Sequence, residues 1–326
     1  MNFFIAGLGS MGKRRIRCLN TLGHENIVGF DMREDRRKEA IKKHGIKTVE
    51  NVEDVDFDAI DAIIISTPPD KHLDYVRLAI QKNKPSFVEA SVILEGLTDS
   101  RLAAENKGLL IAPSCTLRFH PAVKNIKKIV EGGQYGKVTN FSYHCGQYLP
   151  DWHSWEKVTD YYVSRKEVSA CREIVPFELT WIVDILGPVE NGRAFYGKTM
   201  DVGADVDDTY AITLQFKECY GTMIVDVVSR SAVRSLLLNM ELGQIKWDWT
   251  NNYIKLFCSK NETWKEIEVS NGKAADGYNP NIIEEMYIEE LETFITATEK
   301  KELWPNTLCD DIDILKTLHK LEGISF

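Results

Sequence analysis

Short apolar runs and longer amphipathic stretches alternate along the first third of the chain. The runs lie at residues 3–6, 26–30, 46–49, 59–65 and 85–89, and a last helix and strand span residues 100–112. The run at residues 59–65 is almost wholly apolar, which is typical of a parallel strand covered on both faces. The stretches between the runs have the length and polarity of surface helices. Regular alternation of strand and helix predicts a doubly wound parallel α/β sheet over residues 1–118.

The pattern changes after Pro121. An amphipathic helix over residues 121–130 precedes strands that follow one another without intervening helices. Residues 210–216 alternate apolar and polar side chains, which is typical of a strand buried on one face. We therefore expect a second, α+β domain over residues 119–326, with a mostly antiparallel open sheet that serves substrate binding and oligomerisation. The closing helices, at residues 281–298 and 309–321, are expected to pack on one domain or to bridge both.

Three glycines follow the first apolar run with the GxGxxG spacing of a dinucleotide-binding turn. In such a turn the first glycine permits the tight bend and the second lets the backbone approach a pyrophosphate. The third lets helix pack closely on strand. The first helix then offers free N–H groups to phosphate. The loop residues expected to bind the cofactor are Gly7, Leu8, Gly9, Ser10, Met11 and Gly12.

An acidic residue, Asp31, ends the second strand, 19 residues after Gly12 (31 minus 12). This is close to the expected place of the carboxylate that binds the adenosine ribose. A carboxylate accepts hydrogen bonds from the ribose and repels a 2′-phosphate, so Asp31 favours NAD. Arg33 and Arg36 follow at once, and guanidinium groups bind a 2′-phosphate well. NADP therefore stays open as an alternative.

Composition narrows the possible partners and the location. The chain of 326 residues carries a net charge of −9, with a pI near 5.4, which argues against nucleic acid. It has no run of about 18 apolar residues and no charged-then-apolar leader, so we expect no membrane partner. Seven scattered cysteines without a CxxC pair are better explained by free thiols in a reducing cytoplasm than by disulfides or a metal site.

Several short motifs together resemble the Gfo/Idh/MocA oxidoreductase family. They are GLGSMG, STPPDKH, VEAS, LRFHP and GKV, with Gly-Pro at 187–188 closing a helix. The resemblance implies hydride transfer between a nicotinamide and a hydroxyl of a sugar, cyclitol or nucleotide sugar. It also implies a homodimer or homotetramer paired through the open sheet. The further residues that we assign to the cofactor, mostly on this resemblance, are Arg33, Ser66, Thr67, Pro68, His72, Glu89 and Ala90.

The chain departs from this family at two catalytic positions. Where the family has Glu-Lys-Pro, this chain has Glu89-Ala90-Ser91, and no ammonium can sit there. Where the family's active helix carries Asp and His, this chain has Glu173 and Phe177. Three alternatives follow: an oxidoreductase with a relocated acid/base, an enzyme such as a lyase, epimerase or glycosidase that uses held NAD transiently, and a scaffold that retains the nucleotide without catalysis.

Two residues are candidates for the missing proton transfer. Glu173 lies on a helix stripe with Phe177, and partial burial of a carboxylate there would raise its pKa toward a useful range. Its alternative role is a carboxylate that complements the helix dipole. His120 could exchange a proton near neutral pH, or could simply begin a helix before Pro121. Glu178 lies on the apolar stripe of the same helix and needs a partner, for which Arg118 or Arg172 is expected.

The aromatic segment at residues 146–155 is the candidate substrate surface. It places Tyr148, Trp152 and Trp155 beside Asp151 and His153. Aromatic faces with interspersed acids grip sugar rings, but a loop that tucks its aromatics under a domain looks the same in sequence. The residues assigned to a carbohydrate substrate are Arg118, Tyr148, Trp152 and Arg172. This segment also resembles family members that act in bacterial surface-sugar pathways.

Overall fold

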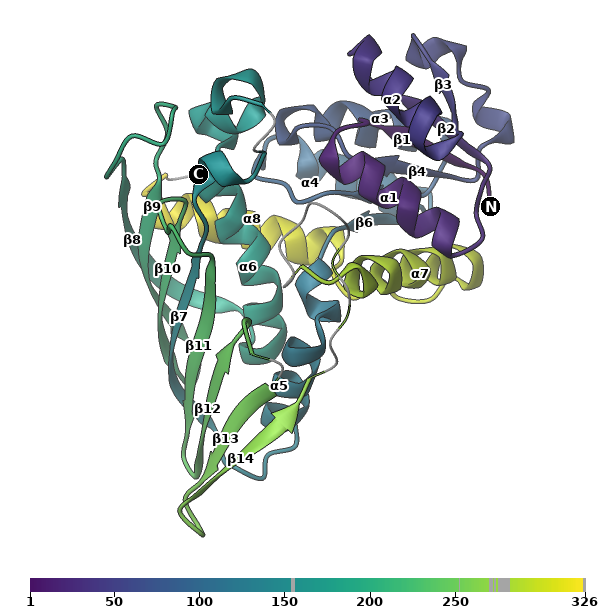
Figure 1. Cartoon of the computed structure of the whole chain (residues 1–326). Helices are drawn as coiled ribbons and strands as arrows, with labels where there is room; N and C mark the ends of the chain where they lie inside the picture. Colours follow the sequence, from purple (N-terminus) through teal and green to yellow (C-terminus); the bar gives the residue numbers. More distant parts are fainter. Residues whose placement is uncertain (154–155, 252, 270–271, 273, 275–281, 325–326) are drawn as a thin grey trace. The chain divides into compact units, whose positions relative to one another are not determined.

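A computed structural model describes residues 1–153, 156–251, 253–269, 272, 274 and 282–324 (Figure 1). The chain divides into two compact units. The first comprises Met1–Thr116 and Glu284–Asp313, and the second comprises Leu117–Ile283 and Ile314–Phe326. The expectation that residues 119–326 form one continuous domain is therefore wrong for residues 284–313, which pack with the first unit. The apolar stripe of a helix shows that it is buried but not against which sheet.

The first unit contains a parallel sheet of six strands in the order β3-β2-β1-β4-β5-β6, which confirms the predicted doubly wound fold. The strands are β1 (Phe3–Ala6), β2 (Ile27–Phe30), β3 (Lys47–Val49), β4 (Ala62–Ile65), β5 (Ser86–Val88) and β6 (Ile111–Pro113). The helices are α1 (Ser10–Thr21), α2 (Glu34–His44), α3 (His72–Lys82), α4 (Leu97–Asn106) and α7 (Glu284–Lys300). The central strands β1 and β4 are wholly buried, which explains their continuous apolar sequence.

A buried arginine joins three parts of this unit. Arg15 on α1 is fully buried, and its Nε and Nη2 donate to the two carboxylate oxygens of Glu89 at 2.6 and 3.0 Å. Its Nη1 lies 2.9 Å from Glu290 on α7, which packs against α1. Glu290 also accepts hydrogen bonds from Ser114, Cys115 and Thr116 after β6. These charges link α1 and α7 to the ends of β5 and β6.

The second unit contains eight strands in the order β14-β13-β12-β11-β7-β10-β9-β8. All neighbours are antiparallel except β7 and β10, so the predicted mostly antiparallel sheet is confirmed. The strands are β7 (Val138–Gly146), β8 (Val189–Gly197), β9 (Thr209–Phe216), β10 (Tyr220–Asp226), β11 (Val233–Met240), β12 (Gly243–Asp248), β13 (Tyr253–Cys258) and β14 (Thr263–Glu268). The helices are α5 (Pro121–Glu131) and α6 (Ala170–Leu186), and α8 (Leu308–Leu321) begins in the first unit and ends in the second.

One face of this sheet is packed and the other carries exposed side chains. Ile212, Met223 and Tyr143 occupy matching positions on neighbouring strands and are buried, and α6 contacts β9 and β10 (Figure 1). The described residues between β7 and α6 form four short 3₁₀ turns: η5 (Leu149–Asp151), η6 (Val158–Asp160), η7 (Tyr162–Ser164) and η8 (Lys166–Val168). The sequence pattern did not predict these turns.

Removing the Arg15 charge should weaken the first unit strongly. We expect Arg15→Met to lower the free energy of unfolding by about 3–5 kcal/mol, because Glu290 would be left as a buried carboxylate without its counter-charge. Arg101→Met is the control, since Arg101 forms an exposed pair with Glu105 one helical turn away, and it should change stability by less than about 1 kcal/mol. Urea denaturation measures both. Equal small losses would show that the Arg15 network does not hold this unit together.

Candidate functional site

The glycine turn has the geometry of a phosphate cradle. Gly7 has a φ of +91°, and a Cβ placed there would lie 2.4 Å from the carbonyl oxygen of Ser66. A Cβ on Gly12 would lie 1.9 Å from the carbonyl oxygen of Gly7, so helix and strand can approach only with glycine at this position. At Gly9 a Cβ would meet only the Arg36 guanidinium, at 3.4 Å. The backbone at Gly9 therefore faces open space at the start of α1, where a pyrophosphate fits.

Asp31 is built into this turn. Its carboxylate is nearly buried and accepts a hydrogen bond from the Leu8 N–H at 2.8 Å and another from the Arg33 N–H at 2.9 Å. The end of β2 is thereby tied to the glycine loop. Both carboxylate oxygens have accepting capacity beyond these bonds. The ribose contact stays a prediction, and the structure adds that Asp31 also positions the loop.

Arg33 and Arg36, two of the three arginines that follow β2, contact different groups. The Arg33 guanidinium donates to both oxygens of Asp35, at 3.1 and 2.6 Å, and this hydrogen bonding lowers the pKa of Asp35 to about 2. Arg36 lies by Gly9, with its Nη1 3.6 Å from Asp31 Oδ2. The guanidinium beside the candidate cofactor site is therefore that of Arg36, which was not among the assigned cofactor residues.

The loop after β4 contains an unsatisfied hydroxyl and a histidine clamp. Thr67 Oγ1 is buried and has no hydrogen-bond partner in the described part of the chain, which fits a contact to a bound cofactor. His72 Nε2 donates to the Thr67 carbonyl at 2.8 Å, and its Nδ1 lies 2.9 Å from Ser91 Oγ. Burial lowers the pKa of His72. Both ring nitrogens are engaged, so His72 positions this loop, and the cofactor contact that the resemblance implied stays a prediction.

Other assigned cofactor residues surround this loop. Glu89 directly follows β5 and pairs with Arg15, and the Ser66 hydroxyl donates to Glu89 at 3.4 Å. Ala90 follows with no group that can transfer a proton. Pro68 precedes the short turn η3 (Pro69–Lys71) that leads into α3. Glu89 is thus held as a counter-ion of a buried arginine, a role that sequence analysis missed because Arg15 is 74 residues away.

Glu173 lies in the first turn of α6 and has a phenol as partner. The Tyr162 hydroxyl donates to Glu173 Oε2 at 2.8 Å. Both residues belong to the second unit, and the bond fixes the carboxylate against the 3₁₀ turns that precede α6. A carboxylate held by a phenol can accept a proton and exchange it along the hydrogen bond.

His120 caps the N-terminal end of a helix. It is the N-cap of α5, where its Nδ1 accepts a hydrogen bond from the Ala122 N–H at 3.1 Å. Burial, and then the Arg234 guanidinium, lower the pKa of His120 to about 3. The imidazole is therefore neutral at physiological pH. The structure favours the helix-start interpretation of His120 over proton exchange near neutrality.

The two arginines assigned to substrate bind other parts of the second unit. Arg118 Nε donates to the Thr180 carbonyl at 3.0 Å, and its Nη1 lies 3.4 Å from Asp184. Arg172 forms a bidentate pair with Glu322, at 2.7 and 2.9 Å. The Arg118 bonds hold α6 to the short turn before α5, and the Arg172 pair holds α6 to the C-terminal segment. Both guanidinium groups are thus engaged by groups of the protein itself, so the assignment to substrate stays a prediction.

The buried Glu178 is paired as expected but with a different arginine. Its carboxylate accepts from Arg234 Nη2 at 2.5 Å, from the Tyr143 hydroxyl at 2.6 Å and from Trp181 Nε1 at 2.9 Å. The expectation of Arg118 or Arg172 as partner was wrong. Arg234 lies on β11, 56 residues away, and only the sheet register brings it under α6. The role of Glu178 is structural.

Two of the assigned aromatic residues lie in the described part of the segment after β7. The Arg230 guanidinium stacks over Tyr148, 3.7 Å from the ring centre. Trp152 Nε1 is buried without a hydrogen-bond partner among the described residues. Trp155 lies outside the described residues. In this segment the Tyr148 ring is thus covered by an arginine, and the Trp152 indole N–H lacks a hydrogen-bond acceptor among the described residues.

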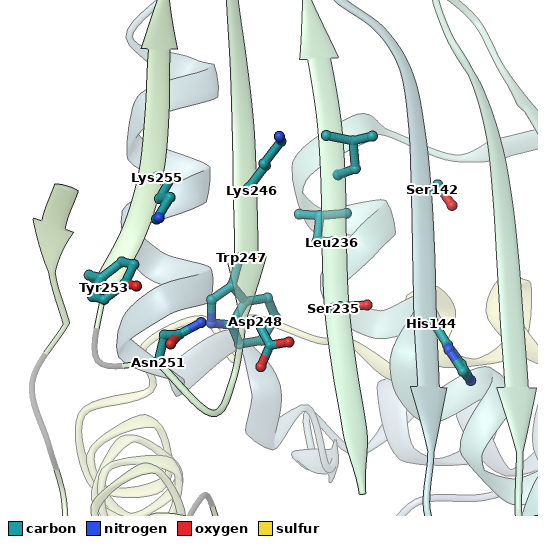
Figure 2. A pocket seen from close by; sticks show the side chains of 11 residues that line it. Ser142, His144, Ser235, Leu236, Lys246, Trp247, Asp248, Asn251, Tyr253 and Lys255 are labelled. Carbon is teal, nitrogen blue, oxygen red and sulfur yellow. The ribbon is translucent and has the colours of Figure 1, made fainter. Parts of the chain in front are cut away.

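A shallow pocket lies elsewhere, across the exposed face of the antiparallel sheet. Ser142, His144, Lys246 and Lys255 line it, on strands β7, β12 and β13 (Figure 2). None of the residues assigned to cofactor or substrate takes part in it. Among the described residues no group of three His, Cys, Asp or Glu is arranged to hold a metal, and no helix is long and apolar enough to cross a membrane.

Comparison with known proteins matches both units to one family. Residues 1–108 match the family model described as an oxidoreductase family with an NAD-binding Rossmann fold. Residues 123–246 match the C-terminal domain of the same family. Two Bacillus subtilis proteins are each 29% identical, over 137 and 140 residues. They are an uncharacterised oxidoreductase, YrbE, and scyllo-inositol 2-dehydrogenase (NAD(+)), and the matches span only 40% and 41% of each chain.

Solved structures share the fold over nearly the whole chain. An Agrobacterium radiobacter oxidoreductase, solved with NAD+, L-tartaric acid and magnesium, has a TM-score of 0.86 at 13% identity, covering 99% of this chain and 95% of its own. UDP-N-acetylglucosamine 3-dehydrogenase from Acidithiobacillus ferrooxidans has a TM-score of 0.78 at 14% identity, covering 99% and 97%. The family models, with the glycine turn and its carboxylate, lead to one conclusion: the chain belongs to the NAD-binding Gfo/Idh/MocA oxidoreductase family.

Proposed function

We propose that this protein is an NAD-dependent oxidoreductase that acts on a hydroxyl group of a sugar, an amino sugar or a nucleotide sugar. The observation that carries the proposal is the glycine cradle, in which Gly7 and Gly12 allow the close turn and Gly9 leaves room for a pyrophosphate. Asp31 at the rim of this cradle favours a free ribose hydroxyl, and hence NAD over NADP. Thr67, with its unsatisfied hydroxyl, is a further cofactor contact.

Glu173 is the group we propose for proton transfer. Bound NAD supplies a hydride acceptor, so the chain must supply a group that takes the proton of the substrate hydroxyl. Ala90 and Phe177 stand where the family has its lysine and histidine, and His120 is a neutral helix cap. The Tyr162–Glu173 bond leaves a positioned carboxylate in the second unit. The alternative is a lyase, epimerase or glycosidase that uses bound NAD without net oxidation of the substrate. It is supported by the same observation, the absence of the family's lysine and histidine.

The substrate class is supported by relatives and by the aromatic segment. One curated relative acts on scyllo-inositol, and a protein of the same fold acts on UDP-N-acetylglucosamine. Tyr148 and Trp152 lie in a segment whose aromatic and acidic residues suit a polyhydroxylated ring. The surface-carbohydrate pathway suggested by the sequence remains part of this proposal. All seven cysteines are free, which suits a reducing compartment such as the cytoplasm.

A second copy of the chain is the partner we propose for the exposed face of the antiparallel sheet. Phe195, Tyr220, Ile224 and Trp264 lie on this face, with exposed fractions of 86, 65, 36 and 43%. On β10, Tyr220 and Ile224 alternate with buried residues, and the strand register places Phe195 and Trp264 on the same face. A broad sheet face with exposed aromatic side chains is typical of an interface. We therefore propose a homodimer, or a homotetramer built from two such dimers.

Loss of the Asp31 carboxylate should discriminate between the cofactors. We expect Asp31→Ala to weaken NAD binding far more than NADP binding, because the lost acceptor serves a hydroxyl that NADP carries as a phosphate ester. Arg36→Gln is the matched variant and should weaken NADP more than NAD. Fluorescence titration of both cofactors measures the losses. Equal losses of the two cofactors with Asp31→Ala would exclude the ribose assignment.

Neutralising Glu173 should abolish most turnover. We expect the Glu173→Gln variant to keep the fold and the NAD affinity of the parent protein. Its turnover number on an identified sugar should fall by about 100-fold or more, the scale of a lost general base. His120→Asn is the control, since asparagine still caps a helix, and it should stay active. An active Glu173→Gln beside an inactive but folded His120→Asn would transfer the proton role to His120. If both variants keep parental turnover, neither residue is the base.

The proposed interface predicts the molar mass in solution. Light scattering should give two or four times the chain mass of 37.2 kDa at micromolar concentration. Ile224→Glu places a charge within the exposed row and should return the mass of a single chain. Leu303→Glu is the control, because Leu303 is 93% exposed and belongs to the first unit, not to this sheet, and it should leave the mass unchanged. A parent protein of about 37 kDa would contradict the assembly.

A further inference from the structure

Two buried hydrogen-bond donors in the segment between β7 and α6 lack partners. They are Trp152 Nε1 and the hydroxyl of Tyr161, neither of which has a hydrogen-bond partner within the described residues. A buried donor without an acceptor costs free energy, so native proteins keep few of them. Both donors belong to the second unit and lie nine residues apart in the chain (161 minus 152). They point to a ligand that supplies the missing acceptors.

The Tyr161 ring is held in place on two sides. It stacks on His153 with ring centres 4.6 Å apart and planes 22° from parallel, and His153 Nδ1 lies 2.7 Å from Glu156 Oε1. Tyr162 meets the Tyr161 ring edge-on at 6.2 Å and holds Glu173 through its hydroxyl. The unpartnered hydroxyl is therefore fixed by packing and is not a side chain left to rotate in solvent.

The local charges decide what these donors can bind. Burial, and then the charges of Glu156 and Glu173, raise the pKa of Tyr161, so its hydroxyl keeps its proton and can donate. The indole N–H of Trp152 can only donate. Both donors thus require acceptor oxygens. Two carboxylates close to Tyr161 disfavour an anionic group there, and their oxygens accept hydrogen bonds from ligand hydroxyls.

We propose that Tyr161 and Trp152 form a subsite that donates hydrogen bonds to oxygen atoms of a sugar ring without negative charge. Hydroxyl oxygens accept from the two donors while the ring's C–H face packs on the aromatic side chains. Because Tyr162 links this subsite to Glu173, the ring lies on the side of the candidate base. The identification of this ring as the substrate rests on the proposed function, whereas the binding of the ring does not.

Stability of the ligand-free protein separates binding from structure. Tyr161→Phe deletes a hydroxyl that has no partner, so the melting temperature should stay the same or rise. Tyr143→Phe is the matched variant, since its buried hydroxyl is bonded to Glu178 and Arg234, and its melting temperature should fall. If Tyr161→Phe lowers the melting temperature as much as Tyr143→Phe does, the hydroxyl is structural and the proposal fails.

Sugar binding tests the subsite directly. D-glucose or D-glucosamine should raise the melting temperature of the parent protein more than D-glucuronate does. We expect Tyr161→Phe and Trp152→Phe each to raise the Kd for the better sugar by about five- to tenfold, the scale of one lost hydrogen bond. Tyr220→Phe, which removes an exposed hydroxyl on the sheet, should leave this Kd unchanged. No stabilisation by any of the three sugars, or preference for glucuronate, overturns the proposal.

A parallel NAD titration keeps the two proposals apart. Sugar binding that depends on Tyr161, in a protein that does not bind NAD, upholds the subsite and overturns the oxidoreductase proposal. NAD binding, with a Kd for sugar that Tyr161→Phe and Trp152→Phe leave unchanged, overturns the subsite alone.

Discussion

The first unit depends on how one guanidinium is buried. Arg15 lies in the interior of the unit, and such a charge is tolerated only where carboxylates and further hydrogen bonds surround it. Glu89 supplies a bidentate partner and Glu290 a second charge. Because Glu290 lies on a helix that follows residues 117–283 of the second unit in sequence, the chain must return to the first unit for the charge to be balanced. The same interaction fixes Glu89 at the end of β5, beside the loop that we assign to the cofactor.

The second unit also contains a buried charge, which lies between α6 and the antiparallel sheet. Glu178 is fully buried on α6 and is held by Arg234, Tyr143 and Trp181. This bonding fixes the rotation of α6 about its axis. Glu173, one turn and a half toward the start of the same helix, therefore has a defined direction as well. Structural and candidate catalytic carboxylates share one helix, and the buried one positions the other.

The sequence predicts structure correctly where the conformation depends on residues that are close together in the chain. The glycine turn could be predicted because each glycine answers a local steric requirement, and the strands of the parallel sheet could be predicted from their continuous apolar runs. Reasoning failed where a side chain chooses a distant partner. The Arg234 partner of Glu178, the packing of residues 284–313 with the first unit and the two bonds of His72 all depend on tertiary packing. An apolar stripe or a lone histidine is compatible with several such partners.

The bond between Ser91 and His72 limits which residues can occupy position 91. Ser91 stands where relatives with the Glu-Lys-Pro motif carry proline, and its hydroxyl meets the ring of the buried His72 at 2.9 Å. A proline there would take away that hydroxyl and leave a buried imidazole nitrogen unsatisfied. A lysine at position 90 would leave this bond in place, whereas the complete Glu-Lys-Pro motif would remove it unless another group near His72 replaced the hydroxyl. The packing around His72 in this chain therefore depends on serine at position 91.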